Sequence, residues 1–422
     1  MDKTILIINS GSSSLKFQLL DAANYKEIAS GKAEHLNSGR ATFTIEANDS
    51  KEKDQLDGKG THVDAIQRLF DELEERGLKK TVKAVGHRVV NGTNVFTEPV
   101  LLEDQIIDEI EALKPFAPLH NPAAVAGMRA IQKVMPSLPQ VAVFDTSFHQ
   151  TMPEQAYRYA VPDSWYEKYG VRRYGFHGIS YKYVSHRAAE LLNIPLEESD
   201  FVIAHIGGGA SVAAVHNGKS VDTSMGFTPL QGLVMGTRSG DIDPAVVSYM
   251  ADKQNKTADE ILDELNHQSG VYGLSGGLTS DQRELEEGAE QGHKGAKLAM
   301  KVMAYSIAKY IAGMMIALPK VDAIVFTAGI GENSSALRKQ ICDHLTVFGY
   351  DIDEERNREI VGRNGVDGVI SVKDTPKIMM VRTNEELMIA EETENVIRDI
   401  NAAKRRMAKT AKEAAEKEAK QL

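Results

Sequence analysis

Cysteine and tryptophan are almost missing from this chain of 422 residues, which contains one of each. The single cysteine, Cys342, excludes a disulfide framework and any metal site built from several cysteines. Its helix-like surroundings predict that it packs in the protein interior. Long hydrophobic runs are missing too, because the longest one, residues 302–318, is interrupted by Lys309 and followed by Pro319. This run predicts a buried helix and a candidate contact between subunits, not a membrane span.

Positive charge is in the minority. The chain has 49 Lys and Arg residues against 60 Asp and Glu residues, a formal net charge of −11. An acidic chain is not drawn to nucleic acid or to an anionic membrane, so we expect neither partner. Any anionic substrate must therefore meet a local cationic pocket. The chain also starts without the pattern of a secretory signal peptide, and we expect a cytoplasmic location.

The length exceeds what one hydrophobic core usually supports, and predicts two domains. Apolar residues at helical spacing predict a helix over 62–76. The polar stretch 46–60 has no apolar period and predicts an exposed connection. After about residue 401 the sequence is rich in Ala, Lys and Glu, which predicts a solvated helical extension.

Three turns rich in glycine and hydroxyl residues each follow a short β-branched run. Glycine and serine let backbone N–H groups approach phosphate oxygens closely, so such turns can hold polyphosphate. One such turn is weak evidence, because most are tight hairpins, but three together favour a nucleotide site. They are Asn9-Ser-Gly-Ser-Ser-Ser-Leu-Lys16, Ile206-Gly-Gly-Gly-Ala-Ser211 and Phe326-Thr-Ala-Gly-Ile-Gly-Glu-Asn333.

The first two turns lie in matching contexts. Residues 4–21 and residues 200–218 both read as strand, turn, strand, which indicates an internal duplication. Each hairpin is followed later by a buried strand that ends in a hydroxyl or glycine turn, 141–147 in the first half and 323–329 in the second. The two halves of the chain are therefore expected to be homologous.

This organisation resembles the actin-like ATPase superfamily, which includes sugar kinases and acyl kinases. The resemblance implies an α/β fold of two duplicated actin-like, ribonuclease H-like domains with an ATP cleft between them. The expected first domain is 1–147, completed by a C-terminal helix at about 386–403. The second is 148–385, and a charged helical tail covers 404–422.

Several further motifs strongly resemble the acetate kinase family, from about residue 4 to about residue 395. Chance does not supply so long a series. The motifs are the opening turn with its lysine, His87-Arg-Val-Val90, Pro118-Leu-His-Asn-Pro122, Phe144-Asp-Thr-Ser-Phe-His149, Tyr174-Gly-Phe-His-Gly178, the loop from Asp222 to Pro244 around Arg238, the turn 326–333, and Thr383-Asn-Glu-Glu-Leu-Met-Ile-Ala390.

An acyl kinase does not need a strong general base, since a carboxylate is already ionised at pH 7. Arginines, a metal ion and hydrogen-bond donors then stabilise the charge that develops on the phosphoryl oxygens. The resemblance assigns Arg238 and His177 to transition-state stabilisation, and Arg88 to the substrate carboxylate or the transferring phosphoryl group. Asp145 ends a buried strand, where a carboxylate must be paired or linked to a metal, and the resemblance makes it a catalytic residue.

The remaining site residues also come from the resemblance. Residues expected around the substrate and its methyl group are Val90, Leu119, His120, Phe176 and Pro229. Expected nucleotide-binding residues are Ser12, Ser14, Lys16, His205, Ile206, Gly207, Gly208, Gly209, Asp281, Gln282, Arg283, Gly329, Ile330, Gly331, Glu332 and Asn333. The metal is expected to be Mg²⁺, with Mn²⁺ as an alternative, near Asn9 and Glu385, and Glu386 is the alternative to Glu385.

The chain departs from the family pattern in four places. Gly208 stands where the family usually has asparagine, so one phosphate-facing amide is lost. The residues 91–93 and 179–181 replace His-Gly-Gly and Thr-Ser-His, and the loop 275–281 is one residue longer.

The expected activity is reversible, Mg²⁺-dependent phosphoryl transfer between ATP plus acetate and ADP plus acetyl phosphate, by a homodimer. Alternatives are a kinase that prefers propionate or butyrate, and a paralogue of low activity that binds nucleotide or acetyl phosphate as a sensor.

Overall fold

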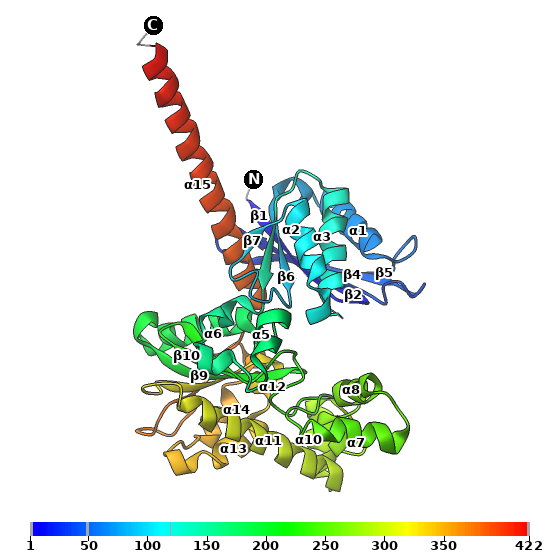
Figure 1. Cartoon of the computed structure of the whole chain (residues 1–422), viewed down its shortest axis with the longest axis vertical. Helices are drawn as coiled ribbons and strands as arrows, with labels where there is room; N and C mark the ends of the chain where they lie inside the picture. Colours follow the sequence, from blue (N-terminus) through cyan, green and yellow to red (C-terminus); the bar gives the residue numbers. More distant parts are fainter. Residues whose placement is uncertain (1–2, 48–49, 119, 420–422) are drawn as a thin grey trace. The chain divides into compact units, whose positions relative to one another are not determined.

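Two β-sheets, each in its own part of the chain, organise the computed structural model, which describes residues 3–47, 50–118 and 120–419 (Figure 1). The chain divides into two compact units. Unit 1 comprises the described residues of Met1–Ser147 and Glu385–Leu422, and unit 2 comprises Phe148–Asn384.

Unit 1 contains an eight-stranded sheet in the order β5-β4-β3-β2-β1-β6-β8-β7. Strand β1 is antiparallel to β2 and parallel to β6, and β6 is parallel to β8. The strands are β1 (Thr4–Ser10), β2 (Ser14–Asp21), β3 (Glu27–Glu34), β4 (Thr42–Ala47), β5 (Ser50–Gln55), β6 (Val82–Val89), β7 (Val100–Leu101) and β8 (Gln140–Phe144), and the helices are α1 (His62–Glu75), α2 (Asp104–Ala112), α3 (Asn121–Val134) and α15 (Glu385–Ala419).

Helices α3 and α15 pack on opposite faces of this sheet. Neighbouring residues of a strand point to opposite faces, and Ile8 of β1 lies near α3 whereas Ile7 lies near α15. The close approach of α15 depends on Gly86 in β6, because a Cβ built there would lie 2.4 Å from Oγ1 of Thr393. This packing fixes the start of α15, and therefore Glu385, beside the ends of the central strands.

Unit 2 repeats the central order of unit 1 in a six-stranded sheet, β11-β10-β9-β12-β14-β13. Strand β9 is antiparallel to β10 and parallel to β12, as β1 is to β2 and β6. The strands are β9 (Asp200–Ile206), β10 (Ala210–His216), β11 (Lys219–Thr223), β12 (Ala323–Thr327), β13 (Gly368–Val369) and β14 (Ile378–Met380).

The helices of unit 2 include α6, which packs on β9, and α11, which packs on β9 and β10. Among the described helices none is long and apolar enough to span a bilayer. The α-helices of unit 2 are α4 (Glu154–Tyr157), α5 (Asp163–Tyr169), α6 (Gly178–Leu192), α7 (Ala245–Gln254), α8 (Ala258–His267), α9 (Gly270–Leu274), α10 (Gln282–Glu290), α11 (Lys294–Met315), α12 (Ala328–Asn333), α13 (Ser335–Asp343) and α14 (Glu354–Glu359).

The predicted duplication is confirmed. However, the two buried strands that the sequence analysis matched, β8 and β12, occupy different positions in their sheets. Strand β12 lies directly beside β9, whereas β8 lies one strand away from β1, with β6 between them. The strand equivalent to β12 is therefore β6. Both β8 and β12 are fully buried and end in a polar turn, so their sequences look alike although their places in the sheet differ.

Two local predictions also need correction. Residues 50–55 form the edge strand β5, because backbone pairing with β4 holds a strand whose side chains are all exposed. The buried helix expected at 302–318 begins earlier and ends earlier, as α11. The helix expected at 62–76 is confirmed as α1, which a capping box at Thr61 begins, and Cys342 is buried as predicted.

Candidate active site

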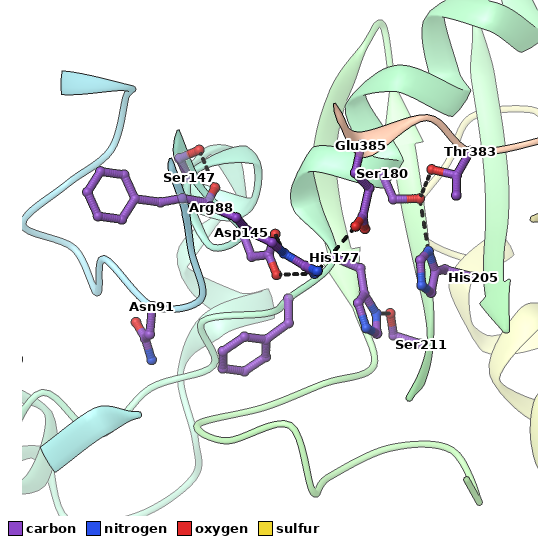
Figure 2. Close-up of polar contacts among 12 residues, drawn as sticks. Arg88, Asn91, Asp145, Ser147, His177, Ser180, His205, Ser211, Thr383 and Glu385 are labelled. Carbon is purple, nitrogen blue, oxygen red and sulfur yellow. Dashed lines mark hydrogen bonds and ion pairs between the residues drawn. The ribbon is translucent and has the colours of Figure 1, made fainter. Parts of the chain in front are cut away.

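Unit 1 holds a buried cluster of one arginine and two carboxylates (Figure 2). Asp145 accepts two hydrogen bonds from the guanidinium of Arg88, from Nε to Oδ1 at 3.3 Å and from Nη2 to Oδ2 at 2.8 Å. Nη1 of the same guanidinium lies 3.2 Å from Oε2 of Glu385. The predicted partner of the buried Asp145 carboxylate is thus an arginine, which can bind it through two parallel bonds.

The sheet brings these three residues together. Strands β6 and β8 are parallel, with Arg88 opposite Val143, and the backbone N–H of Asp145 donates to the carbonyl of Val89 at 2.9 Å. Glu385 is the first residue of α15. Burial by itself lowers the pKa of Arg88, but the charges of Asp145 and Glu385 outweigh it and raise this pKa above its ordinary value. Arg88 therefore remains a fixed cation.

The same unit contains the predicted metal-binding residues. Asn9, on β1, offers an amide oxygen and Glu385 a carboxylate, and oxygen ligands of this kind suit Mg²⁺. No group of three or more His, Cys, Asp or Glu residues could hold a metal ion within the part of the chain that the structure describes. The donor set thus fits an ion that keeps most of its waters.

The first phosphate turn joins β1 to β2. The N–H of Gly11 donates to the carbonyl of Ser14 at 2.7 Å, and Ser12 and Lys16 are exposed. The carbonyl of Gly11 also contacts Nε2 of His62 at 2.9 Å, which ties the turn to the start of α1. This contact of His62 is not predictable from the sequence, since nothing in the sequence relates position 62 to the turn.

Two predicted substrate residues of unit 1 lie beside a pair of buried asparagines. Asn121 donates to the carbonyl of Asn91 at 2.8 Å and accepts from its N–H at 3.3 Å. The pair brings half-buried Val90 close to half-buried His120, since each adjoins one asparagine. Leu119 lies outside the described residues.

Unit 2 holds a second cluster, built around two stacked histidines (Figure 2). The rings of His177 and His205 are 4.0 Å apart and nearly parallel. Nδ1 of His177 lies 2.8 Å from Oγ of Ser211, and Nδ1 of His205 lies 2.9 Å from Oγ of Ser180. His177 precedes α6 with φ of 59°, an uncommon conformation for a residue with a side chain. The hydroxyl contacts hold both rings in place.

Arg238 and His177 both face Gly209, in the second phosphate turn. A Cβ built on Gly209 would lie 3.3 Å from Nη1 of Arg238 and 3.5 Å from Nε2 of His177. Nη1 of Arg238 donates to the carbonyl of Pro229 at 3.2 Å and lies 3.7 Å from Sδ of Met235. No carboxylate among the described residues forms an ion pair with Arg238, and burial lowers its pKa. The guanidinium of Arg238 is shielded from water and has no counter-ion among the described residues, so it is suited to bind an anion.

The second and third phosphate turns differ in how their side chains are used. In the second, the N–H of Gly207 donates to the carbonyl of Gly209 at 3.0 Å, and the three glycines have no side chains to contribute. In the third, Oε1 of Glu332 accepts from the N–H groups of Ala328 and Thr383, each at 2.9 Å. Burial raises the pKa of Glu332, although these bonds oppose the shift. The side chain of Glu332 therefore shapes the turn.

Asn333 likewise bonds within its own surroundings, from Nδ2 to the carbonyl of Gly329 at 2.9 Å. Below this turn, the fully buried Arg338 donates to the carbonyls of Gly331 at 2.7 Å and Glu332 at 2.8 Å. It was not predicted, because an arginine on a helix gives no sign of such burial. Arg338 therefore stabilises the backbone of the third turn through these two hydrogen bonds.

The segment 281–283 begins α10. Asp281 caps this helix by accepting from the N–H groups of Arg283 at 2.9 Å and Glu284 at 3.3 Å. Gln282 is buried and its amide contacts Glu286, whereas the side chain of Arg283 is 86% exposed. Of the three predicted nucleotide residues, Asp281 and Arg283 are exposed and Gln282 is buried.

Two predicted substrate residues of unit 2 adjoin the histidine cluster. Phe176 is buried, and its carbonyl accepts from Nε2 of His149 at 2.9 Å. Pro229 contributes the carbonyl that Arg238 binds. A separate cavity of about 670 Å³ between α11 and α13 contains no predicted site residue.

Known proteins are similar to this chain over most of its length. The model of the acetokinase family matches residues 4–391. An acetate kinase of Deinococcus radiodurans is 50% identical over 392 residues, covering 93% of this chain and 98% of the relative. One from Thermotoga maritima is 48% identical, covering 94% and 99%.

Solved structures are similar as well. A propionate kinase from Francisella tularensis matches with a TM-score of 0.88 and 42% identity, covering 93% of this chain and all of the other. The acetate kinase of Porphyromonas gingivalis matches with a TM-score of 0.88 and 38% identity, covering 94% and 100%.

Proposed function

Because the chain belongs to the acetokinase family, we propose that it is an acetate kinase, an ATP:acetate phosphotransferase. A carboxylate oxygen of acetate attacks the γ-phosphorus of ATP, and the bond from this phosphorus to the β,γ-bridging oxygen breaks. The products are acetyl phosphate and ADP, and the reaction runs in both directions. No proton is transferred, since the attacking carboxylate is already ionised at neutral pH.

The observation that best supports this activity is the environment of Arg238. Phosphoryl transfer places negative charge on the equatorial oxygens, and a preorganised cation stabilises it best where water is excluded. Arg238 is half-buried, has no ion-pair partner among the described residues, and faces the same glycine as His177. These two residues are the proposed stabilisers of the transition state.

In unit 1 the proposed substrate-side residues are Arg88 and Asp145. The two hydrogen bonds that Asp145 accepts hold the guanidinium plane of Arg88 in one orientation. An arginine held in this way can present a remaining N–H edge to a carboxylate or phosphoryl oxygen. Asp145 thus acts by orientation and not as a general base. The residues proposed to contact the acyl group are Val90, Leu119 and His120 of unit 1 and Phe176 and Pro229 of unit 2.

The proposed nucleotide contacts follow the glycine turns. Backbone N–H groups of Gly208, Gly209 and Gly329–Gly331 suit phosphate oxygens. The N–H of Gly207 already donates to the carbonyl of Gly209, so Gly207 is proposed to contribute by letting the turn approach the phosphates closely. Glu332, Asn333 and Asp281 take part indirectly, since their side chains already bind the backbone around them. The other proposed contacts are Ser12, Ser14, Lys16, His205, Ile206, Gln282 and Arg283.

Phosphoryl transfer in such kinases uses a divalent cation, which neutralises phosphate charge. We propose Mg²⁺, with Mn²⁺ as a substitute, held by Glu385 and Asn9. The proposal also includes a homodimer, with α11 as a candidate contact because Leu298 and Tyr305 on it are exposed. A cytoplasmic location remains part of the proposal.

The test is acyl phosphate formation from ATP and Mg²⁺, measured in parallel with acetate, propionate and butyrate. We expect the highest kcat/KM with acetate. A higher value with propionate or butyrate would keep the kinase and replace the substrate, since one methylene changes binding by about 1 to 3 kcal/mol. Nucleotide binding without turnover of any acid would favour the sensor.

A further inference from the structure

Helix α6 carries a buried tyrosine close to the catalytic histidine, where the family pattern has histidine. Tyr181 lies one helical turn after His177, and its backbone N–H donates to the carbonyl of His177 at 3.0 Å. Residues four apart share one face of a helix. Tyr181 and Ser211 of β10 are both fully buried, so water does not compete for their hydroxyl groups.

The hydroxyl groups form a chain that ends on the imidazole. The backbone N–H of His205 donates to the Tyr181 hydroxyl. The Tyr181 hydroxyl also contacts Oγ of Ser211, which lies 2.8 Å from Nδ1 of His177. With the Tyr181 oxygen accepting from His205, the pattern that gives every buried hydroxyl proton an acceptor is the one in which Tyr181 donates to Ser211. The proton of Ser211 is then directed to Nδ1 of His177.

The opposite direction leaves a donor without its acceptor. If Nδ1 of His177 donated to Ser211, two patterns would be possible. Ser211 could donate to Tyr181, and the phenol proton would then lose Ser211 as its acceptor. Alternatively, Ser211 could accept from both residues, and its own proton would then need an acceptor other than the two groups it contacts. Burying an unmade hydrogen bond is unfavourable. Burial also raises the pKa of Tyr181, so the phenol keeps its proton and its role as a donor.

We propose that Tyr181 is a positioning residue that, through Ser211, holds His177 in the neutral tautomer with its proton on Nε2. This inference rests on the proposed function for its catalytic meaning. Nε2 is the nitrogen that faces Gly209, beside Nη1 of Arg238. In this tautomer His177 offers an N–H to phosphoryl oxygens, whereas the other tautomer would turn a lone pair toward them.

The first measurement is the ¹⁵N spectrum of the histidine rings in the full chain, with His177 assigned through His177→Gln. We expect the wild type to show a protonated Nε2 and an unprotonated Nδ1. Tyr181→Phe removes only the hydroxyl, and we expect it to populate the second tautomer. Ser211→Ala breaks the same link beside the ring, and decides the matter should Tyr181→Phe not fold.

The second measurement is steady-state kinetics of acetyl phosphate formation. We expect kcat of Tyr181→Phe to fall by about tenfold or more, because the wrong histidine tautomer impairs catalysis. The KM for ATP should change by less than about twofold, since the glycine turns are untouched. The matched control is Tyr174→Phe, which removes a buried phenol whose hydroxyl donates to the carbonyl of Gly170 at 2.7 Å.

A wild-type spectrum with the proton on Nδ1 would overturn the inference. So would a Tyr181→Phe variant whose tautomer and kcat match those of Tyr174→Phe. The spectrum needs no turnover, so the two proposals can fail separately. An Nε2–H tautomer that shifts in Tyr181→Phe, in a protein that phosphorylates no acid, would support the positioning role and refute the kinase.

Discussion

Two arginines, one in each unit, illustrate two uses of the same side chain. Arg88 binds two carboxylates, Asp145 and Glu385, at distances of 2.8 to 3.3 Å. Arg238 contacts only a carbonyl and a thioether among the described residues. With both carboxylates ionised, the formal charge of the first cluster is −1, whereas that of the second centre is +1.

Because their formal charges are opposite, the two clusters suit different ligands. A net negative cluster with oxygen ligands attracts a cation, so the unit 1 cluster is suited to hydrated Mg²⁺. A net positive centre beside a glycine turn attracts the phosphoryl group. Arg88 gains a fixed orientation from its partners, and Arg238 keeps its charge available. Substitutions in the two clusters should therefore have different signatures.

The largest effect is expected at Arg238, for which the described part of the chain supplies no counter-ion. Arg238→Ala should lower kcat by about 10³-fold, because the charge that develops in the transition state loses its cation. Arg238→Lys should recover part of this loss, since it restores charge without the planar fork. The measurement is the initial rate of acetyl phosphate formation at saturating ATP.

The matched control is Arg40→Ala, which removes an exposed arginine of unit 1. Its kcat should stay within about twofold of the wild type, in keeping with surface substitutions. Equal losses in the two variants would mean that Arg238 acts through net charge alone.

The next effect separates two adjacent carboxylates. Glu385→Gln should raise the Mg²⁺ concentration needed for half-maximal rate by about tenfold, since the proposed metal ligand and a partner of Arg88 are lost together. Glu386→Gln is the matched control, because Glu386 is exposed and forms no ion pair among the described residues. Titrating the rate with Mg²⁺ decides between them. A shift confined to Glu386→Gln would move the metal site by one residue.

The motifs that contain these residues could be found in the sequence, because glycine turns after buried strands are local patterns. The need of Asp145 for a partner could also be deduced, since a buried carboxylate is costly alone. Its choice of Arg88 could not, because that depends on the parallel pairing of β6 with β8. The stacking of His177 on His205 and the burial of Arg338 likewise arise only when distant segments meet.

In one respect the two units should behave alike. His87 in unit 1 and His149 in unit 2 are buried, and burial lowers the pKa of each to about 4, against an ordinary value of 6.5. Below pH 6.5 the unfolded chain therefore binds more protons than the folded one. The free energy of unfolding should therefore fall as the pH drops from 6.5 to 4. At pH 5 each histidine should already have lowered it by about 2 kcal/mol.

Urea unfolding followed by circular dichroism at pH 7, 6 and 5 tests this symmetry. His87→Gln and His149→Gln should each flatten the pH dependence, and the double variant should show the sum, because the two sites lie in separate units. An undiminished slope in either variant would show that its histidine is not held neutral.

The smallest effect concerns Gly208, in the turn that Arg238 faces. A Cβ built on Gly208 meets no atom within 4 Å, so the turn has room for the asparagine of the family pattern. Gly208→Asn should lower the KM for ATP by about threefold to tenfold, because an added amide can donate to a phosphate oxygen, which is worth about 1 kcal/mol. Gly208→Ala fills the same space without a donor and should leave this KM unchanged.

Equal KM values for the two variants would indicate that the backbone N–H groups of the turn already satisfy the phosphates, as the proposed role of the glycine turns allows. A lower KM in Gly208→Asn alone would show that the positive centre of unit 2 binds its anion less tightly than its geometry permits.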